Sequence, residues 1–178
     1  MSSMRTERRA AWLTRRVLTD HGEGGSKVPT RIEPGEVVVS ETGEPYAQTM
    51  TDGRHSVVAD EPGDVGGGDA GASPYGLLLM SLGACTSMTI RLYADRKDWP
   101  LTGITVRLKH FRGHIEDAKD FEDPAAFLDR IERVIELDGP LDEVQRARLM
   151  EVAGMCPVHR TLSHRTKIDT TLSSVALD

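Results

Sequence analysis

The chain is poor in cysteine, in aromatic residues and in positive charge. It has 2 cysteines in 178 residues, and aromatic side chains make up only 4% of it. A dense disulfide framework is therefore excluded, and aliphatic side chains must fill the core. Lysine and arginine number 22 against 28 acidic residues, which gives a formal net charge of −6. We expect no nucleic-acid partner, because there is no basic excess to neutralise phosphates.

Long apolar runs and secretory signals are also lacking. The segment Leu77–Ile90 carries no formal charge, but it is rich in Ser, Thr and Gly and is closed by Arg91. It is too short to be a convincing membrane span. We therefore expect a cytoplasmic protein with no membrane partner, and the chain has the length of one domain.

The first 35 residues differ from the rest in composition. Several arginines, among them Arg5, Arg8 and Arg9, stand between apolar residues, and a glycine-rich stretch follows over 21–26. We predict an N-terminal extension over 1–35, helical or flexible, and a folded domain over 36–178. The function of the extension is not readable from these residues.

Turn residues divide the first part of the domain into short strands. Strands are predicted over 37–39 and 46–50, and Thr51-Asp52-Gly53 predicts a hairpin turn before a strand over 55–59. The glycine-rich segment 60–71 lacks the Lys-Ser/Thr ending of a phosphate-binding loop. We interpret it as a connector whose glycines let the backbone approach the following helix closely.

Alternating apolar residues predict further strands over 104–110 and 130–137, which we expect to pair antiparallel. The acidic segment 116–129 between them is predicted to be an excursion at the surface. The same alternation predicts a closing strand over 165–172. Together with the helices described next, these strands give an α+β fold. The residues predicted to face inward are Ile104, Val106, Leu108, Ile131, Ile135 and Leu137.

A long core helix is predicted to begin at Ser73-Pro74, since serine caps free N–H groups and proline suits the first helical position. Apolar or small residues cover every side of it, which is typical of a buried helix. Helical spacing places Cys85 at mid-helix on one stripe. Taken alone, such a cysteine is either an inert filler or a functional thiol. The stripe consists of Leu78, Leu82, Cys85, Thr89 and Leu92.

A second helix is predicted from the capping box of Asp142 and Gln145 to Gly154. Proline directly after Cys156 then predicts a short helix whose N-terminus holds the sulfur, where N–H groups and the helix dipole favour a thiolate. His159 and Arg160, one turn on, add positive charge. The residues leave two interpretations open, a reactive or resolving thiol and a simple helix cap.

A metal site is a further alternative, because Cys156 and His159 stand three residues apart. His110, His114 or Cys85 would complete its tetrahedron. The chain contains no C-x-x-C, and we expect neither a metal nor any other cofactor.

Two cysteine motifs in this order resemble a known family. The segments 71–89, 94–101 and 156–162 closely resemble the OsmC/Ohr superfamily, in particular its OsmC-like branch. Arg54-His55 and the segment 59–62 look like the same branch. The resemblance covers about residues 36–175 and leaves only the N-terminal extension outside it.

The resemblance implies curved antiparallel sheets around a long buried central helix, in an intertwined homodimer with active sites near the subunit interface. It also implies thiol-dependent reduction of organic hydroperoxides in defence against oxidative stress. Carried onto this chain, Cys85 is the peroxidatic thiol and Cys156 the resolving thiol, which forms a disulfide that a dithiol reductant such as a lipoyl protein reopens. The apolar stripe around Cys85 would then select hydrophobic peroxides.

The chain departs from the family pattern at Tyr75 and Gly76. Better-studied members place a glutamate there, which holds an arginine over the reactive sulfur. Arg54, in the hairpin turn, is our candidate for that cation, and Glu61 or Asp69 is a substitute anchor. His159 is included only as a neighbour of Cys156.

Two other functions are weighed against the peroxidase. One is a non-enzymatic dimer of the same fold that senses redox state or binds a small apolar ligand. The other is a Cys/His metal-binding protein.

Overall fold

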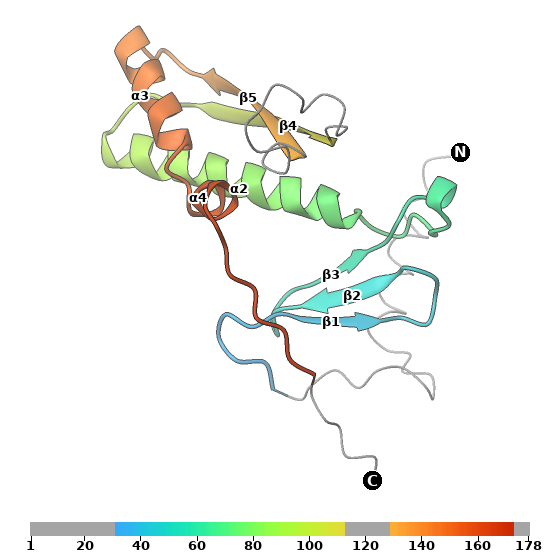
Figure 1. The fold of residues 1–178 in the computed structure, drawn as a ribbon. Coiled ribbons are helices and arrows are strands. Elements are labelled where there is room, and N and C mark those ends of the chain that lie inside the picture. The colour runs from blue at the N-terminus through green and yellow to red at the C-terminus, as the bar shows by residue number, and fades with distance from the viewer. Residues whose placement is uncertain (1–30, 113–128, 173–178) are drawn as a thin grey trace, which may run out of the picture. The chain divides into compact units, whose positions relative to one another are not determined.

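The computed structural model of the protein describes residues 31–112 and 129–172. Nearly all of the predicted N-terminal extension and of the acidic excursion lies outside these residues, so both stay predictions. The chain divides into two compact units, residues 1–74 and 75–178. The elements of each unit are labelled in Figure 1 and are described unit by unit.

The first unit contains a three-stranded antiparallel sheet in the order β1-β2-β3. Its strands are β1 (Val38–Glu41), β2 (Gln48–Thr51) and β3 (Ser56–Ala59). The predicted hairpin turn between β2 and β3 is confirmed, and each predicted strand shifts by one or two residues. The Asp52 carboxylate closes the turn by accepting the N–H groups of Arg54, at 2.8 Å, and of His55, at 2.6 Å.

The glycine-rich connector is fixed by the buried carboxylate of Asp60. It accepts the N–H group of Glu61, at 2.8 Å, and those of Gly68 and Ala70, each at 3.0 Å. The loop includes a short 3-10 helix, η1 (Gly63–Val65). Gly71 passes so close to β3 that a Cβ atom would lie 2.1 Å from the Val58 carbonyl oxygen. The backbone of the connector therefore approaches β3 closely, whereas the prediction had it approach the following helix.

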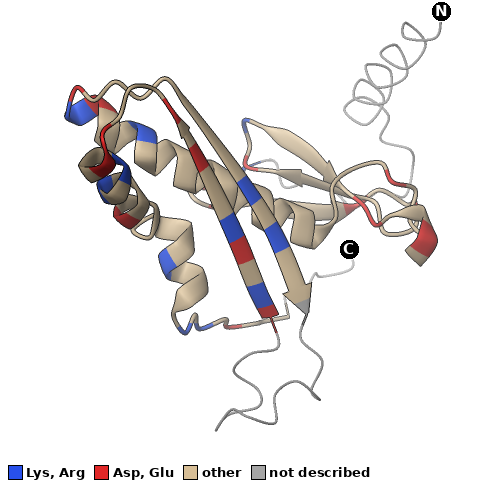
Figure 2. Cartoon of the chain, turned by 90° about the horizontal axis from the view of Figure 1, so that it is seen from above, with Lys and Arg blue, Asp and Glu red and all other residues tan. Residues whose placement is uncertain are grey.

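The second unit packs the long helix α2 (Pro74–Arg96) against an antiparallel pair of strands (Figure 1). The strands are β4 (Gly103–Arg112) and β5 (Asp129–Asp138), in register from Gly103 opposite Asp138 to Arg112 opposite Asp129. The predicted start of the helix and the predicted pairing are confirmed. Charged positions recur along β4 and β5 (Figure 2), and exposed positions alternate with half-buried ones along β5, which fits a sheet with one solvated face.

The buried face of α2 is rotated from the predicted stripe. Leu82 is buried and Cys85 is half-buried, but Leu92 is 53% exposed. The close approach of helix and sheet explains part of the difference: at Gly83, a Cβ atom would lie 2.9 Å from the Leu108 side chain. Gly83 therefore belongs to the packed face. The buried residues of α2 are Leu82, Gly83, Thr86, Ile90 and Ala94.

Two further helices complete the unit, α3 (Glu143–Ala153) and α4 (Pro157–Ser163). The capping box of Asp142 and Gln145 is present at the start of α3, and Gly154 follows its end, as predicted. α3 contributes Leu149 and Ala153, both fully buried, to the main core. That core also contains Ile90, Ala94, Leu101 and Leu141.

The predicted strand over 165–172 is wrong. The segment forms no helix or strand, and Ile168 and Leu172 are 83% and 98% exposed. Alternation makes a segment able to join a sheet, but a strand also needs a neighbouring strand to pair with. Among the described residues, none pairs with this segment.

α2 is the one described helix that is long and apolar enough to cross a membrane by length and composition. Core helices pass the same test. Its contacts favour the core, because Ile90 and Ala94 are fully buried against the other elements of the unit.

Candidate active site

Cys156 sits at the N-terminus of α4, as the Cys-Pro pair predicts. It is the N-cap residue, and Pro157 occupies the first helical position. The Cys156 sulfur accepts the N–H group of His159 at 3.3 Å, so it satisfies one of the free donors of the first turn. The residue is fully buried. The interpretation of Cys156 as a helix cap is therefore correct, and its neighbours decide whether it does more.

α4 lies beside α2, the helix that carries the other cysteine (Figure 1). The thiol of Cys85 lies near enough to the Cys156 sulfur to lower the pKa of Cys156. The next residue of α2, Thr86, places its hydroxyl oxygen 3.7 Å from that sulfur. Cys85 is half-buried and Cys156 is fully buried, and neither is in a disulfide. Cysteines 71 residues apart in the sequence therefore form one thiol pair.

β5 supplies a cation to the pair, through Arg133. Its Nη1 atom donates to the Thr86 hydroxyl at 2.8 Å and to the Ala153 carbonyl at 3.2 Å. Sequence reasoning missed this residue, although the signal was present. Arg133 falls in the inward register of the alternating strand, between Ile131 and Ile135. Charged residues are rarely buried at such positions unless they are paired.

Opposing effects act on the Cys156 thiol. Burial alone raises its pKa. The N–H group of His159, the Thr86 hydroxyl, the Cys85 thiol and the charge of Arg133 lower it, and together they leave the pKa of Cys156 below its ordinary value. The site therefore favours a thiolate at Cys156.

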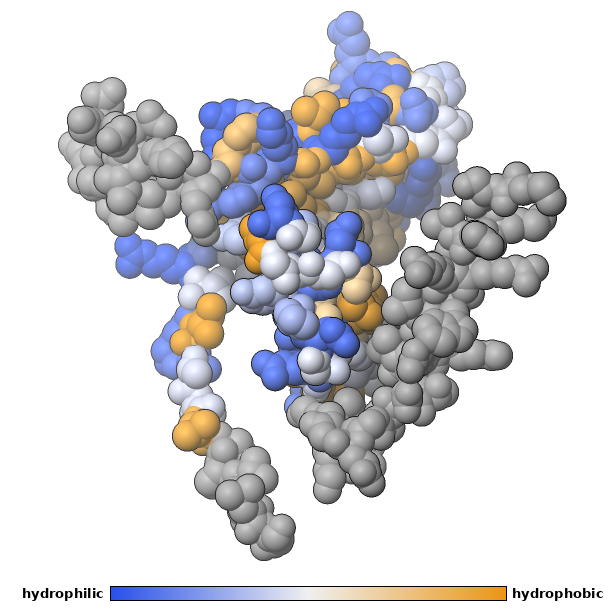
Figure 3. Space-filling model, turned by 90° about the vertical axis from the view of Figure 1, so that its right-hand side faces the viewer, coloured by the Kyte–Doolittle hydropathy of each residue, from blue (hydrophilic) through white to orange (hydrophobic). Residues whose placement is uncertain are grey.

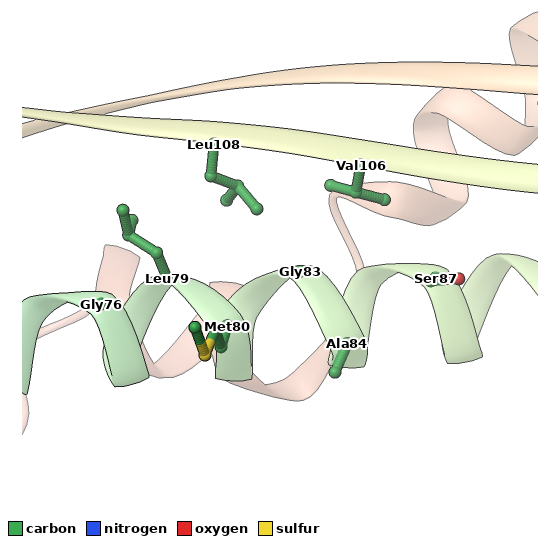
Figure 4. Close-up of a pocket in the computed structure, with 8 residues that line it drawn as sticks. All are labelled: Gly76, Leu79, Met80, Gly83, Ala84, Ser87, Val106 and Leu108. Carbon is green, nitrogen blue, oxygen red and sulfur yellow. The ribbon is translucent and has the colours of Figure 1, made fainter. Parts of the chain in front are cut away.

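Two hollows lie in this unit. One, of about 350 Å³, is next to the thiol pair and is lined by Leu82, Asp129, Ile131, Arg133, His159, Leu162 and Ser163. His159 thus lies where it was predicted, as a neighbour of Cys156. The other hollow, of about 480 Å³, is apolar and lies between α2 and β4. In Figure 4, Leu108 and Val106 point from β4 toward α2, where Leu79 and Gly83 face them.

Cys85 is not among the residues that line the apolar hollow. The prediction that an apolar stripe surrounds Cys85 is therefore corrected. The stripe does not stay on one buried side of α2: Leu82 is buried and Cys85 is half-buried, whereas Leu92 is exposed.

Arg54 lies in the predicted turn and is exposed. It belongs to the first unit, so its place relative to the thiol pair is not described and its role stays a prediction. The same holds for Glu61 and Asp69. Asp69 donates its N–H group to the Glu61 carbonyl, which fixes both in the connector.

Tyr75, at the family's glutamate position, stacks on His110, with ring centroids 4.4 Å apart. The Nε2 atom of His110 lies 2.7 Å from the Asp129 carboxylate. The first turn of α2 is therefore linked to a carboxylate through a histidine.

The metal alternative gains no support from the geometry. Within the ranges 31–112 and 129–172, no three His, Cys, Asp or Glu side chains gather in a way that could hold a metal ion. His114, one of the suggested ligands, lies outside these ranges.

Comparison with known proteins agrees with this fold and these motifs. The family model described as OsmC-like protein matches residues 66–171, which include both cysteines. The chain belongs to the OsmC-like family. No curated protein matches the chain by sequence.

Solved structures similar to this OsmC-like chain share its fold at low identity. An OsmC-like protein from Mycoplasma pneumoniae matches with a TM-score of 0.57 at 19% identity, over 76% of this chain and 89% of its own. An organic hydroperoxide resistance protein OsmC from Legionella pneumophila matches with a TM-score of 0.50 at 17% identity, over 77% and 91%. The mixed fold with small antiparallel sheets and a long central helix is thus that of OsmC-like structures.

Proposed function

We propose that the protein is a thiol peroxidase that reduces organic hydroperoxides with Cys85 and Cys156 and so protects the cell against oxidative stress. The supporting observation is that the two cysteines lie at one place in the second unit: Thr86, the residue after Cys85, places its hydroxyl oxygen 3.7 Å from the Cys156 sulfur. Family membership supports a redox role, and the Legionella neighbour is named for resistance to organic hydroperoxides. Leu82, Ile131 and Leu162, which line the hollow next to the thiol pair, favour organic peroxides over hydrogen peroxide.

The reaction begins with a proton moving between the sulfurs. The Cys156 thiolate takes the proton of the neighbouring Cys85 thiol and leaves Cys85 as the thiolate. Cys85 is the more exposed of the two, and its sulfur attacks the terminal oxygen of the hydroperoxide. The O–O bond breaks, the alkoxide leaves and takes a proton from solvent to become the alcohol, and Cys85 becomes a sulfenic acid.

Resolution follows at the same pair. The sulfur of Cys156 attacks that of the Cys85 sulfenic acid, the S–O bond breaks, and the hydroxide leaves as water with the Cys156 proton. A dithiol reductant then supplies two electrons by thiol–disulfide exchange and restores both thiols. Each cycle converts one hydroperoxide to one alcohol and one water.

The enzyme is proposed to act as a homodimer in which a second copy covers the exposed face of α2. Met80, Met88 and Leu92 lie at spacings of eight and four residues and are 61%, 69% and 53% exposed in the single chain. Figure 3 shows apolar side chains exposed among hydrophilic ones on the face that it draws. Exposed apolar side chains at helical spacing mark interaction surfaces, and obligate dimers bury them.

The activity test is turnover of an organic hydroperoxide and of hydrogen peroxide with a dithiol reductant. We expect faster turnover of the organic substrate. Cys85→Ser abolishes turnover, whereas Cys156→Ser still consumes one equivalent of peroxide, and its sulfenic acid is trapped with dimedone. Met155→Leu, next to Cys156 but 52% exposed, is the matched control and keeps the parent rate.

Negligible turnover of both peroxides, or full turnover in Cys85→Ser, overturns the peroxidase. A chain that forms one disulfide per peroxide but does not turn over supports the redox-sensing alternative. The observation that favours this alternative is Tyr75 in place of the glutamate.

The dimer is tested by sedimentation of Met88→Glu, which places a charge on the exposed face of α2. We expect a shift toward monomer at micromolar concentration. Val144→Glu on α3, where the residue is 77% exposed, is the control and leaves the mass unchanged. A monomeric parent chain contradicts the proposed assembly.

A further inference from the structure

Arg133 is a cation placed where β5 otherwise presents aliphatic residues to the core. The strand alternates exposed and half-buried positions, and Arg133 is half-buried together with Ile131 and Ile135. An inward-facing arginine loses hydration and needs partners that replace water. The chain could fill this position with a branched aliphatic residue, as it does at 131 and 135.

The guanidinium is held by contacts from two helices. Nη1 donates at 2.8 Å to the hydroxyl of Thr86 on α2 and at 3.2 Å to the carbonyl of Ala153 on α3. These contacts fix the guanidinium next to the thiol pair, because Thr86 directly follows Cys85 on α2. Arg133 also lines the hollow beside His159.

Thr86 connects the cation to the sulfur. Its hydroxyl has one hydrogen and two lone pairs. Arg133 donates to the oxygen, while the hydroxyl hydrogen has two acceptors in reach, the Leu82 carbonyl at 2.8 Å and the Cys156 sulfur at 3.7 Å. A charged donor on the oxygen strengthens the hydroxyl as a donor in turn. A negative sulfur is then the acceptor that the hydroxyl prefers.

We propose that Arg133 is a positioning residue for Cys156, which acts through Thr86 and through its own charge to hold this sulfur as a thiolate at the start of α4. This role deepens the proposed function and, as far as turnover is concerned, rests on it. The thiolate is the base that accepts the Cys85 proton. In this way the second unit carries its own cation for the thiol pair, whatever the role of Arg54.

The charged and titratable groups around this sulfur come from three elements. They are Cys85 on α2, Arg133 on β5 and His159 on α4, and from α3 the Ala153 carbonyl reaches Arg133. A titration of Cys156 is therefore cleanest in a Cys85→Ser chain, which has a single thiol and keeps a hydroxyl donor at position 85.

The experiment follows the ultraviolet absorbance of the Cys156 thiolate against pH in the Cys85→Ser chain. We expect Arg133→Met to raise the midpoint by about one pH unit, the effect of losing a nearby opposite charge. Arg133→Lys keeps the charge and recovers most of the shift. Arg107→Met, on the exposed face of β4, is the matched control and leaves the midpoint unchanged.

Thr86→Val provides the second test and removes the hydroxyl at nearly constant volume. We expect it to raise the midpoint as well, and Thr86→Ser to restore it. An unchanged midpoint in a folded Arg133→Met or Thr86→Val chain overturns the proposal. A shift in Arg133→Lys as large as that in Arg133→Met also overturns it, because the role of Arg133 would then be structural and independent of its charge. No peroxide is used, so failure of the peroxidase and failure of this proposal are separate results.

Discussion

Each compact unit buries one polar group that accepts backbone N–H groups, and the two groups differ in what surrounds them. Asp60 is 1% exposed, and its three donors all belong to its own loop, over residues 61–70. Cys156 is 0% exposed and takes one N–H group from its own helix. Its remaining contacts are side chains of α2 and β5.

The comparison separates a structural anion from a reactive one. The N–H group of Ala70 and those of Glu61 and Gly68 hold the pKa of Asp60 below its usual range, against the effect of burial. These donors are backbone dipoles, so the charge is fixed for as long as the loop is folded. The donors to Cys156 are mostly side chains from separate elements, and one of them is a second thiol. Its charge can therefore change during a reaction without loss of the fold.

The largest expected effect is that of oxidation on the second unit. A disulfide between Cys85 and Cys156 closes a loop of roughly 70 residues, for which the chain-entropy account gives roughly 4 kcal/mol. Loss of the sulfur cap on α4 subtracts about 1 kcal/mol. Urea unfolding of a Trp12→Phe chain, followed by the fluorescence of Trp99 in the second unit, measures the difference between oxidised and reduced protein.

The control for oxidation is Cys85→Ser in the same background, whose stability does not respond to the oxidant. Hydrogen exchange of β1–β3 amides is expected to be the same in both redox states, since both cysteines lie in the second unit. A disulfide between chains on a non-reducing gel, in place of one within the chain, contradicts the pairing described here.

A smaller effect is expected from Asp60→Ala in the first unit. Three backbone N–H groups lose their acceptor, so the melting temperature falls by roughly 5 °C or more and amide exchange over 61–70 accelerates. Asp64→Ala, an exposed acidic residue of the same loop, is the matched control. The Cys156 titration is expected to stay unchanged; a shift would show that the two buried groups are not independent.

The pH dependence of this loop follows from the lowered pKa of Asp60. A carboxyl whose pKa is lower in the folded chain than the ordinary 3.8 contributes stability above that value and loses it as the pH falls through the folded value. Exchange over 61–70 should therefore rise only in acid, and this rise should be weaker in Asp60→Ala. A rise beginning near neutral pH would point to another group.

Local signals in the sequence were sufficient for much of this structure. The Cys156-Pro157 pair predicted the start of α4, and Asp52-Gly53 predicted the hairpin turn, because each depends on a few neighbouring residues. The meeting of Cys85 and Cys156 was not derivable from spacing, since it depends on how α4 packs on α2. It was expected only from the family resemblance.

The wrong predictions concern segments whose structure depends on contacts with another element. The alternation of 165–172 describes a segment that can pair, and no described strand pairs with it. The helical stripe through Leu92 assumed burial on a side of α2 that the single chain leaves exposed. Arg133 was missed because only the apolar members of the alternating strand were considered, although its inward register was readable.

The smallest expected effect tests how far the thiol site extends. The Asp142 carboxylate accepts the N–H group of Gln145 at 2.7 Å, and the Gln145 side chain accepts that of Asp142 at 3.0 Å. Asp142→Ala removes the cap and should lower stability by about 1 kcal/mol, measured by urea unfolding against Glu143→Ala. Ala153, whose carbonyl binds Arg133, lies at the other end of α3, so the Cys156 midpoint should not move. A changed midpoint would mean that the whole of α3 positions Arg133. Cys156 would then depend on more of its unit than its direct contacts indicate, whereas Asp60 depends only on its own loop.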